Sequence, residues 1–439
     1  MSTDNNNFAE NNDNDYDSLT DALEQTLFES FDDGLYIGMM SGTSLDGMDA
    51  VLCQFSSGDD NTSAPMTLVA TYSQDFPARL REVLLALCQP NGVRDLISQN
   101  DEPNGHSNSE LDWFGWASRE YSEFASEVVN KLVQQANVDL ENVLAIGCHG
   151  QTVRHRPQMG FSLQLLDANI IAERTGISVV SDFRRRDMAV GGQGAPLVPA
   201  FHQALFANPN TTRVMLNLGG IANIAVLPAT YSDDDRQNDQ QVVGYDTGPA
   251  NLLLDAWALL HTGKHYDAGG TWAQSGRVIA PLLNQLLNHD FFAKDYPKST
   301  GREDFNLAWL TEQLQTFDRG AANTRYSSAD VQATLTELTA ITASNQIRQF
   351  TVDSTTENDI AEVYVCGGGA LNSYLMTRLQ AHLPHCKVAT TSSLGLEPTW
   401  VEAVAFAWLA RQTLMGETGN LPAVTGANKS VVLGQVCFA

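Results

Sequence analysis

The chain has 439 residues, 43% of them hydrophobic, so it is long enough for two or three domains with sizeable cores. Its 52 acidic residues outnumber 25 basic ones, for a formal net charge of -27. That balance argues against a nucleic-acid or anionic-membrane partner, because both surfaces require clustered cations. No apolar run approaches the ~18–20 residues that span a bilayer, and the N-terminus lacks the pattern of a signal peptide.

The six cysteines predict a reduced protein. None forms a C-x-x-C pair, and most stand in apolar, strand-like runs. A cytoplasmic protein with buried thiols is the expectation from this usage. The cysteines are Cys53, Cys88, Cys148, Cys366, Cys386 and Cys437.

The N-terminal part of the chain divides into a tail and a hairpin. Residues 1–33 are rich in Asn, Asp and Glu and contain no Lys or Arg, which predicts a disordered acidic tail with at most one short helix at Leu19–Phe31. The apolar run Leu35–Met40 then predicts a strand, the glycine-containing segment Ser41–Gly47 a turn, and Met48–Phe55 a returning strand.

The same pattern recurs downstream. Arg213–Leu218 is apolar, residues 219–223 form a glycine-rich turn, and Ile224–Leu227 returns. Two hairpins of one design predict two similarly built domains. Strands and helices alternate elsewhere, which predicts an α/β fold with mixed sheets. The other expected strands are Val143–Cys148 and Ile177–Ser181, and the expected helices are Pro77–Leu87, Leu111–Ala136, Asn251–Leu260, Val278–Leu287, Asp330–Phe350 and Val401–Met415.

Both hairpin turns are candidate phosphate sites. Backbone N–H groups and Ser or Thr hydroxyls in Gly42–Asp49 form a concave anion site, and small residues allow close approach. Asp46 and Asp49 are candidates to hold Mg²⁺ directly or through water. Gly219 and Gly220 in the second turn are candidates to clamp other phosphates from the opposite side. Taken singly, each turn is also compatible with an ordinary tight hairpin.

A third glycine-rich segment comprises Gly367, Gly368 and Gly369. It follows the apolar run Val363–Cys366 and precedes a helix, a corner at which a flat ligand or a phosphate can lie against the backbone. The segment does not match G-x-G-x-x-G, and no G-x-x-x-x-G-K-[ST] occurs in the chain, which disfavours the Rossmann and P-loop interpretations. A purely structural corner is the alternative.

Asp246 is the candidate general base. It lies in the phrase GYDTGPAN (244–251), and a carboxylate held there can take a proton from a nucleophile during phosphoryl transfer. The alternative is that Asp246 or Thr247 caps the following helix.

Three further features are candidate substrate contacts. Arg184–Arg186 is the one run of three cations, and guanidinium groups suit a carboxylate or phosphate; an internal ion-pair cluster is the alternative. His149 follows a strand, where polar residues tend to face ligands, and no second His stands at zinc-ligand spacing. Glu402 opens a helix, where it also complements the helix dipole.

Together these phrases resemble the anhydro-N-acetylmuramic acid kinases of bacteria, from Leu35 to Ala439 and in the family's order. The matching segments are GMMSGTSLDGMDAVL (38–52), GCHGQTVRHRP (147–157), DFRRRDMAVGGQGAPLVPAFH (182–202), LNLGGIAN (216–223), GYDTGPAN (244–251), KSTGRE (298–303), VYVCGGGALN (363–372) and EAVAFAWLA (402–410).

The resemblance implies two actin/ribonuclease H-like domains around a central cleft, preceded by the acidic tail. The expected first domain spans 34–192 plus 430–439, and the second spans 193–429. The implied reaction uses ATP and Mg²⁺: water opens the 1,6-anhydro bridge of 1,6-anhydro-N-acetylmuramic acid at C1, and the freed O6 takes the γ-phosphoryl group. The product is N-acetylmuramate 6-phosphate, an intermediate of cell-wall recycling.

The resemblance also implies roles for residues. Asp246 corresponds to the base that activates water, Gly42–Asp49 to the ATP-binding loop, and Glu402 is expected near the sugar. Together with the candidates inferred from the residues themselves, the expected Mg²⁺ contact is Asp46 and the expected substrate contacts are His149, Gln151, Arg186 and Glu402. The expected ATP contacts are Gly42, Thr43, Ser44, Leu45, Asp46, Gly47, Met48, Asp49, Gly219, Gly220, Gly367, Gly368 and Gly369.

One position departs from the family pattern. Leu166 stands where a glycine is usual, and this predicts a local change of the turn before Asp167. Two other functions stay open from the residues: a different sugar or carboxylate kinase of the same superfamily, and a non-catalytic ATP-binding regulator. The expected partner is a small amino sugar, without nucleic acid or membrane, and a homodimer is left open.

Overall fold

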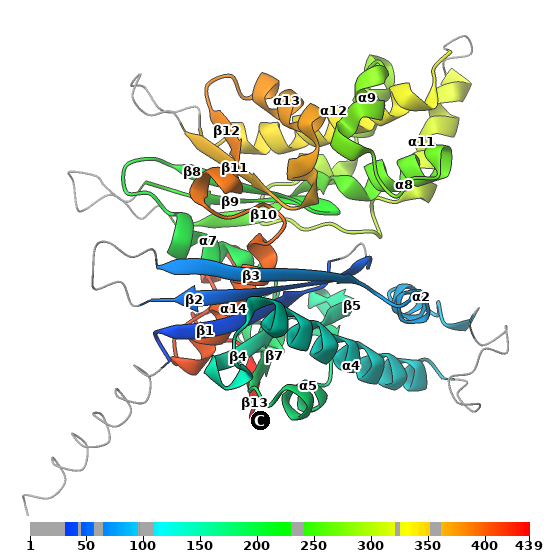
Figure 1. Cartoon of the computed structure of the whole chain (residues 1–439). Coiled ribbons are helices and arrows are strands. Elements are labelled where there is room, and N and C mark those ends of the chain that lie inside the picture. The colour runs from blue at the N-terminus through cyan, green and yellow to red at the C-terminus, as the bar shows by residue number, and fades with distance from the viewer. Residues whose placement is uncertain are drawn as a thin grey trace, which may run out of the picture.

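The computed structural model describes residues 31–42, 45–56, 65–94, 96, 109–229, 241–320, 325–351 and 361–439. The predicted helix Leu19–Phe31 and nearly all of the acidic tail lie outside these residues. Two sheets form two halves of the molecule, one above the other (Figure 1). No helix in the described part of the chain is long and apolar enough to cross a bilayer.

The lower sheet has the strand order β13-β7-β4-β1-β2-β3. The strands β1, β2 and β3 are antiparallel to one another in sequence, β1 with β2 and β2 with β3. The strands β4 and β7 run parallel to β1. The strand β13, from the end of the chain, closes the edge antiparallel to β7. The bounds are β1 (Gly34–Met40), β2 (Gly47–Phe55), β3 (Met66–Asp75), β4 (Val143–Cys148), β7 (Val179–Ser181) and β13 (Gln435–Cys437).

The upper sheet has the order β10-β9-β8-β11-β12. Here too the first three strands in the chain are antiparallel, and the next two run parallel to the first. The order third, second, first, fourth, fifth therefore occurs in both sheets, which confirms the predicted pair of ribonuclease H-like halves. The bounds are β8 (Arg213–Leu218), β9 (Ile221–Leu227), β10 (Val243–Pro249), β11 (Glu362–Cys366) and β12 (Lys387–Thr390).

Helices cover both faces of the lower sheet because its strands carry apolar side chains on both faces. Ile37 and Met39 of β1 pack beneath the helices of one face, and Tyr36 packs toward the other, as the two-residue period of a strand requires. The first face is covered by α2 (Ala78–Leu87), α4 (Glu110–Ala136) and α5 (Ala168–Thr175), and the second by α14 (Val401–Leu414).

The helix α14 lies unusually close to the sheet. A Cβ atom on Gly38 would stand 1.9 Å from the carbonyl oxygen of Ala403, and one on Gly147 would stand 2.0 Å from that of Phe406. Only glycine permits this approach. The predicted domain boundaries assign α14 to the second domain, but it packs on β1, β2 and β4 of the lower sheet.

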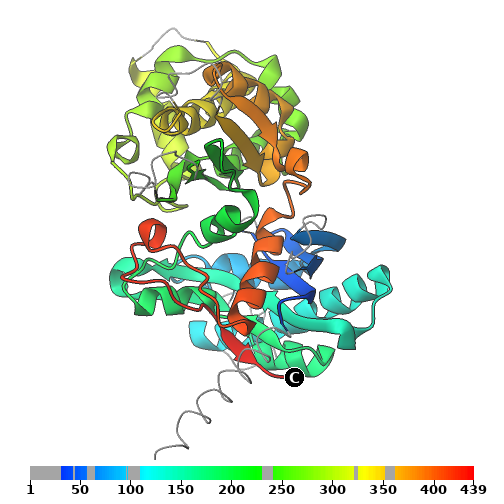
Figure 2. The same ribbon diagram turned by 90° about the vertical axis from the view of Figure 1, so that its left-hand side faces the viewer.

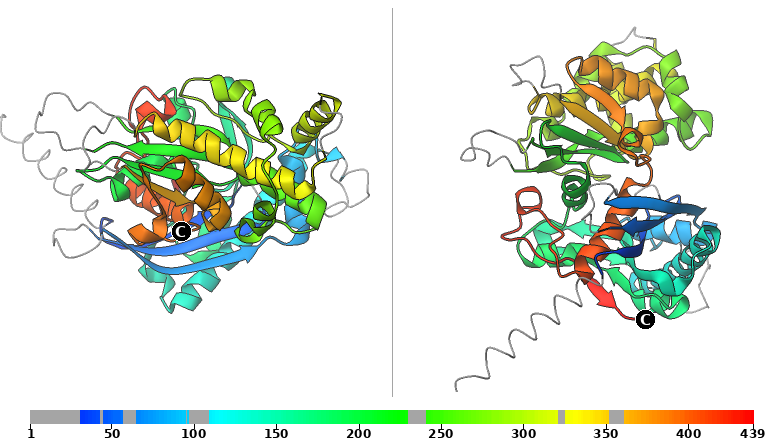
Figure 3. Two further views of the ribbon diagram at one scale, coloured as in Figure 1. Left: turned by 90° about the horizontal axis from the view of Figure 1, so that it is seen from above. Right: turned by 60° about the vertical axis from the view of Figure 1, so that its left-hand side comes forward.

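Two segments fill the space between the sheets. The helix α7 (Val198–Phe206) contacts both β9 and α14, and it lies between the halves in Figures 1 and 2. After α14 the chain returns along the lower half through the short helix α15 (Pro422–Thr425), which contacts β10 of the upper half (Figure 3). A core of apolar side chains is therefore continuous from Tyr36 to Met215 and Ala225.

Helices also cover the upper sheet. The helix α12 lies across it when seen from above (Figure 3) and begins with a capping box between Ser327 and Asp330. The helices are α8 (Asn251–Thr262), α9 (Thr271–Ser275), α10 (Ala280–Leu287), α11 (Leu307–Gly320), α12 (Ser328–Arg348) and α13 (Ser373–His382).

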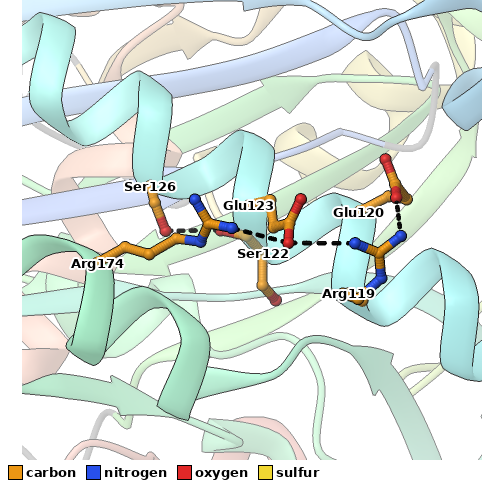
Figure 4. Close-up of polar contacts among 6 residues, drawn as sticks. All are labelled: Arg119, Glu120, Ser122, Glu123, Ser126 and Arg174. Atoms are coloured by element: carbon orange, nitrogen blue, oxygen red, sulfur yellow. Dashed lines mark hydrogen bonds and ion pairs between the residues drawn. The ribbon is translucent and has the colours of Figure 1, made fainter.

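Two smaller features complete the lower half. The strands β5 (Gln151–Arg156) and β6 (Phe161–Leu165) form a separate antiparallel pair. On the surface, the Glu123 carboxylate accepts from Arg119 at 3.2 Å and from Arg174 at 2.8 Å, which links α4 to α5 (Figure 4). Exposed ion pairs of this kind contribute only about 0–1 kcal/mol each.

One helix was not predicted: the segment after β7 forms α6 at Phe183–Ala189. Leu166 has no positive φ, and it packs against the core of the lower half. The glycine usual there is therefore not required by the backbone of this chain.

Candidate active site

Two cavities adjoin each other between the halves. The first has a volume of about 190 Å³ and is lined from both sheets, and the second has a volume of about 260 Å³ and lies over the first hairpin. Both are lined by Met40, at the end of β1, and by Glu402, in the first turn of α14. Ligands in the two cavities would therefore meet at Glu402.

Asp246 lies in the wall of the first cavity. It is inside β10 and pairs with Asn223 of β9, and the residue that caps α8 is Ala250, so the helix-capping alternative for Asp246 is excluded. Its Oδ2 accepts from the backbone N–H of Thr300 at 3.0 Å. Burial raises the pKa of Asp246 to about 7, against the lowering effect of the Thr300 N–H, and Glu303 raises it further.

Glu402 is held between two polar partners. Its Oε1 accepts from Asn217 Nδ2 at 3.2 Å, across the gap between α14 and the end of β8. Burial raises the pKa of Glu402, while the nearby Arg184 guanidinium and the Asn217 hydrogen bond lower it. The close approach of α14 at Gly38 and Gly147 brings this carboxylate to the cavities. The helix dipole alone does not explain its position.

Arg184, rather than Arg186, faces the first cavity. Arg184 lines it, whereas Arg186 is exposed and is absent from the lining of either cavity. The Arg184 Nε donates to Nε2 of His149 at 3.0 Å, and its Nη1 donates to the carbonyl oxygen of Gly194 at 2.8 Å. Burial lowers the pKa of Arg184 to about 10, against the raising effect of Glu402 and Asp187.

His149 and Gln151 are outside the linings of both cavities, and His149 contacts Arg184 of the first one from behind. Both are buried, at 3% exposure. Burial and the Arg184 charge keep the pKa of His149 well below its usual value, so it is a neutral acceptor that orients Arg184. The ring also packs on Phe406, with centroids 4.8 Å apart.

The loop that carries the apolar side of the first cavity is tied to a buried carboxylate. Asp187 is fully buried; its Oδ2 accepts from Gly194 N at 2.8 Å. Its Oδ1 accepts from Asn420 Nδ2 and from Thr425 Oγ1, each at 2.7 Å. The carboxylate thus joins α6, the loop after it and the segment after α14.

The second cavity is acidic. Its described lining includes Asp46, Asp49, Asp75 and Glu402 and no Lys or Arg. Burial raises the pKa of Asp49, which also has a hydrogen bond with Ser73 that lowers it. Asp46 is exposed, and its Oδ1 accepts from Arg81 Nη2 at 2.9 Å.

The first turn itself is only partly described. Thr43 and Ser44 lie outside the described residues, whereas Gly42 and Gly47 line the second cavity. Leu45 has a positive φ of 58°, and its carbonyl oxygen accepts from Arg81 Nε at 2.8 Å. Met48 is buried in the core of the lower half.

The second turn follows β8 and the triple-glycine segment follows the neighbouring strand β11, and the two pack on each other at this end of the upper sheet. The carbonyl oxygens of Gly219 and Gly220 accept from the first residues of α8, at 3.0–3.1 Å. A Cβ atom on Gly367 would stand 2.4 Å from Asn217 Oδ1, and one on Gly369 would stand 2.5 Å from Leu218 Cβ. None of the glycines of the two segments lines either cavity, and Gly368 is exposed.

Several lining residues were missed by sequence reasoning. Those of the first cavity stand inside the matching segments, which did not distinguish inward from outward side chains, whereas those of the second cavity lie outside all of these segments and carried no signal. They are Asn217, Asn223, His155, Gln193, His202, Tyr245 and Lys298 in the first cavity, and Ser73, Asp75 and Thr399 in the second.

No three Asp, Glu, His or Cys side chains among the described residues stand close enough to form a metal-ligand group on their own. This limits what the acidic cavity can hold. A cation there needs ligands from water or from a bound ligand as well. Mg²⁺ meets that condition, because it usually keeps several waters and takes one or two carboxylates.

Comparison with known proteins assigns a family. The family model described as anhydro-N-acetylmuramic acid kinase matches residues 34–439. A relative of that name from Psychrobacter cryohalolentis is 77% identical, covering 97% of this chain and 99% of the relative. One from Psychrobacter arcticus is 75% identical with the same coverage, and one from Shewanella halifaxensis is 47% identical over 91% of this chain and 97% of the relative.

Proposed function

The chain belongs to the anhydro-N-acetylmuramic acid kinase family, and on that premise we propose that the sugar occupies the first cavity and the ATP phosphates the second. The reaction is hydrolysis of the 1,6-anhydro bond of 1,6-anhydro-N-acetylmuramic acid with phosphorylation of O6, giving N-acetylmuramate 6-phosphate and ADP. The observation that supports this placement is the shared wall: the two cavities meet at Glu402 and Met40.

Asp246 is the general base of this proposal. Its carboxylate takes a proton from water, and the water oxygen forms a bond to C1 of the sugar. The C1–O6 bond breaks with its electron pair on O6, O6 bonds to the γ-phosphorus, and the bond from that phosphorus to the ADP oxygen breaks. A carboxylate with a pKa near 7 accepts a proton more readily than one with an ordinary pKa near 4.

Arg184 is proposed to bind the lactyl carboxylate of the sugar. Arg184 and Lys298 both line the first cavity, and the orientation of Arg184 is set by His149 and by the Gly194 carbonyl. A guanidinium group matches a carboxylate in charge and shape. His149 and Gln151 then support the site from behind, and Arg186 has no part in it.

Glu402 is proposed to accept a hydrogen bond from a sugar hydroxyl near O6. Its carboxylate lies at the junction of the two cavities and is already fixed by Asn217. This fixed position aligns the sugar with the phosphate chain. Alignment of this kind is a large part of catalysis when water, C1, O6 and phosphorus must all be in place together.

The acidic lining of the second cavity fits Mg²⁺. Phosphate oxygens beside Asp46, Asp49, Asp75 and Glu402 would be repelled without a cation, and no Lys or Arg lines the described part of that cavity. Asp49 would hold the cation, and Asp46, which is also paired with Arg81, would hold it through water. When bound, Mg²⁺ neutralises charge on the phosphate oxygens. The turns at Gly219, Gly220 and Gly367–Gly369 are proposed to lie along the rest of the nucleotide.

The test is ADP release measured with purified protein, ATP, Mg²⁺ and the anhydro sugar, with mass spectrometry of the product. The product is expected to carry one added water and one added phosphoryl group, and in ¹⁸O-water the label is expected at C1 rather than on phosphate. EDTA is expected to stop the reaction. ADP release that does not depend on the sugar, or label on phosphate, would contradict the proposal.

A further inference from the structure

His202 is a buried polar side chain that the proposed reaction does not use. It lies on α7, has 2% of its surface exposed and lines the first cavity. Neither Nδ1 nor Nε2 has a hydrogen-bond partner within the described structure. Buried polar side-chain atoms nearly always have a partner, so two unpartnered nitrogens on one ring indicate a group that the ligand supplies.

The charge of His202 limits which ligand group can pair with its two ring nitrogens. Burial lowers the pKa of His202 to about 3, so the ring is neutral near pH 7. A neutral imidazole offers one N–H donor and one nitrogen acceptor. It cannot balance a carboxylate, which Arg184 on another part of the wall is suited to bind. It does match a neutral group that both accepts and donates, as an amide does.

The surroundings of the ring supply the apolar part of the match. Leu197 and Val198 line the same cavity from the start of α7, and Val424 lines it from α15. Phe201 and Phe206 have ring centroids 6.0 and 6.1 Å from that of His202. An amide that ends in a methyl group would place the methyl on apolar side chains and its polar atoms on the imidazole.

We propose that His202 binds the acetamido group of the anhydro sugar and gives the enzyme its selectivity for N-acetylated sugars. This inference rests on the proposed placement of the sugar in the first cavity. Since α7 contacts both β9 of the upper half and α14 of the lower half, a sugar held by His202 also lies against the helix on which the two halves pack.

The experiment compares two substrates in the wild type and four variants. The substrates are 1,6-anhydro-N-acetylmuramic acid and the analogue with a free hydroxyl in place of the acetamido group. Three of the variants are His202→Leu, His202→Gln and His202→Ala. His385→Leu is the matched control, because His385 is exposed and lines neither cavity.

His202→Leu is expected to lower kcat/KM for the N-acetylated sugar by roughly 10- to 100-fold, mainly through KM, and to leave kcat/KM for the analogue within about threefold. His202→Gln, which keeps a donor and an acceptor, is expected to retain more of the preference. The affinity for ATP and all values for His385→Leu are expected to stay unchanged.

The outcomes separate this inference from the proposed function. If the wild type does not turn over the N-acetylated sugar, the proposed function fails. The role of His202 is wrong if the wild type turns over the N-acetylated sugar and His202→Leu, with normal ATP binding, lowers kcat/KM equally for both substrates. It is also wrong if His202→Leu lowers kcat/KM for neither substrate. If His202→Leu misfolds and loses ATP binding, the comparison of His202→Gln with His202→Ala decides. The inference is overturned if these two variants have the same ratio of kcat/KM for the N-acetylated sugar over the analogue.

Discussion

The backbone N–H of Thr300 donates to Oδ2 of Asp246 at 3.0 Å, and the backbone N–H of Asp246 donates to the carbonyl oxygen of Lys298 at 3.2 Å. The segment after α10 is thus joined to β10 at the residue proposed as general base. The contact fixes one carboxylate oxygen, and the other has no hydrogen-bond partner among the described residues. The KSTGRE phrase (298–303) therefore has a structural role beside Asp246, which its sequence alone did not reveal.

Replacing Asp246 by Asn tests the base directly. The amide keeps the shape but cannot take the proton of water, so turnover is expected to fall on the order of 10²–10⁴-fold. The dissociation constant for ATP is expected to stay unchanged, because Asp246 lines the first cavity and not the second. Steady-state ADP release and nucleotide titration measure the two effects. Near-normal turnover would remove Asp246 from the role.

The pH dependence of kcat/KM follows from the same carboxylate. Its pKa is raised from 3.8 to about 7, and the base works only when ionised, so kcat/KM is expected to rise with pH through about 7 and to fall tenfold per unit well below it. Glu303→Gln removes a negative charge that raises this pKa, so the acidic limb is expected to move to lower pH. The assignment would be contradicted if the acidic side of the profile had its midpoint near pH 4, or if that midpoint moved to higher pH in Glu303→Gln.

Arg184 and Arg186 form a matched pair of variants. Arg184→Ala is expected to raise KM for the anhydro sugar by roughly 10- to 100-fold, because a carboxylate loses its cationic partner. Arg186→Ala is expected to change KM less than twofold, because that side chain is exposed outside both cavities. Initial rates measured over a range of sugar concentrations give KM for both variants. The reverse ranking would restore the assignment made from sequence.

Asp187 is predicted to stabilise the wall of the first cavity. In Asp187→Ala three buried donors, on Gly194, Asn420 and Thr425, lose their acceptor. The expected loss is roughly 3–5 kcal/mol of unfolding free energy, seen as a lower denaturant midpoint. Asp139→Ala is the control, since Asp139 is exposed and its side chain makes no capping hydrogen bond. Equal midpoints for the two variants would show that Asp187 is not needed.

The local elements could be predicted from sequence because each rests on neighbouring residues. Short runs of mainly apolar residues predicted strands at Leu35–Met40 and Arg213–Leu218, and the structure has β1 and β8 there. The fold class followed from the repetition of the hairpin. Phe183–Ala189 was missed, because one short helix with three arginines carries no apolar periodicity that marks it out.

By itself the sequence determined the strands, the long helices, the family and the chemical identity of the candidate groups, because those depend on residue order over short stretches. The tertiary structure decided which side chains line the cavities. Arg184 and Arg186 are two residues apart on a helix of 3.6 residues per turn, so they point in nearly opposite directions, and only the packing of α6 selects one of them. In the same way, the contact of Gly38 and Gly147 with α14 brings Glu402 to the cavities, and residues so distant in the chain meet only once it has folded.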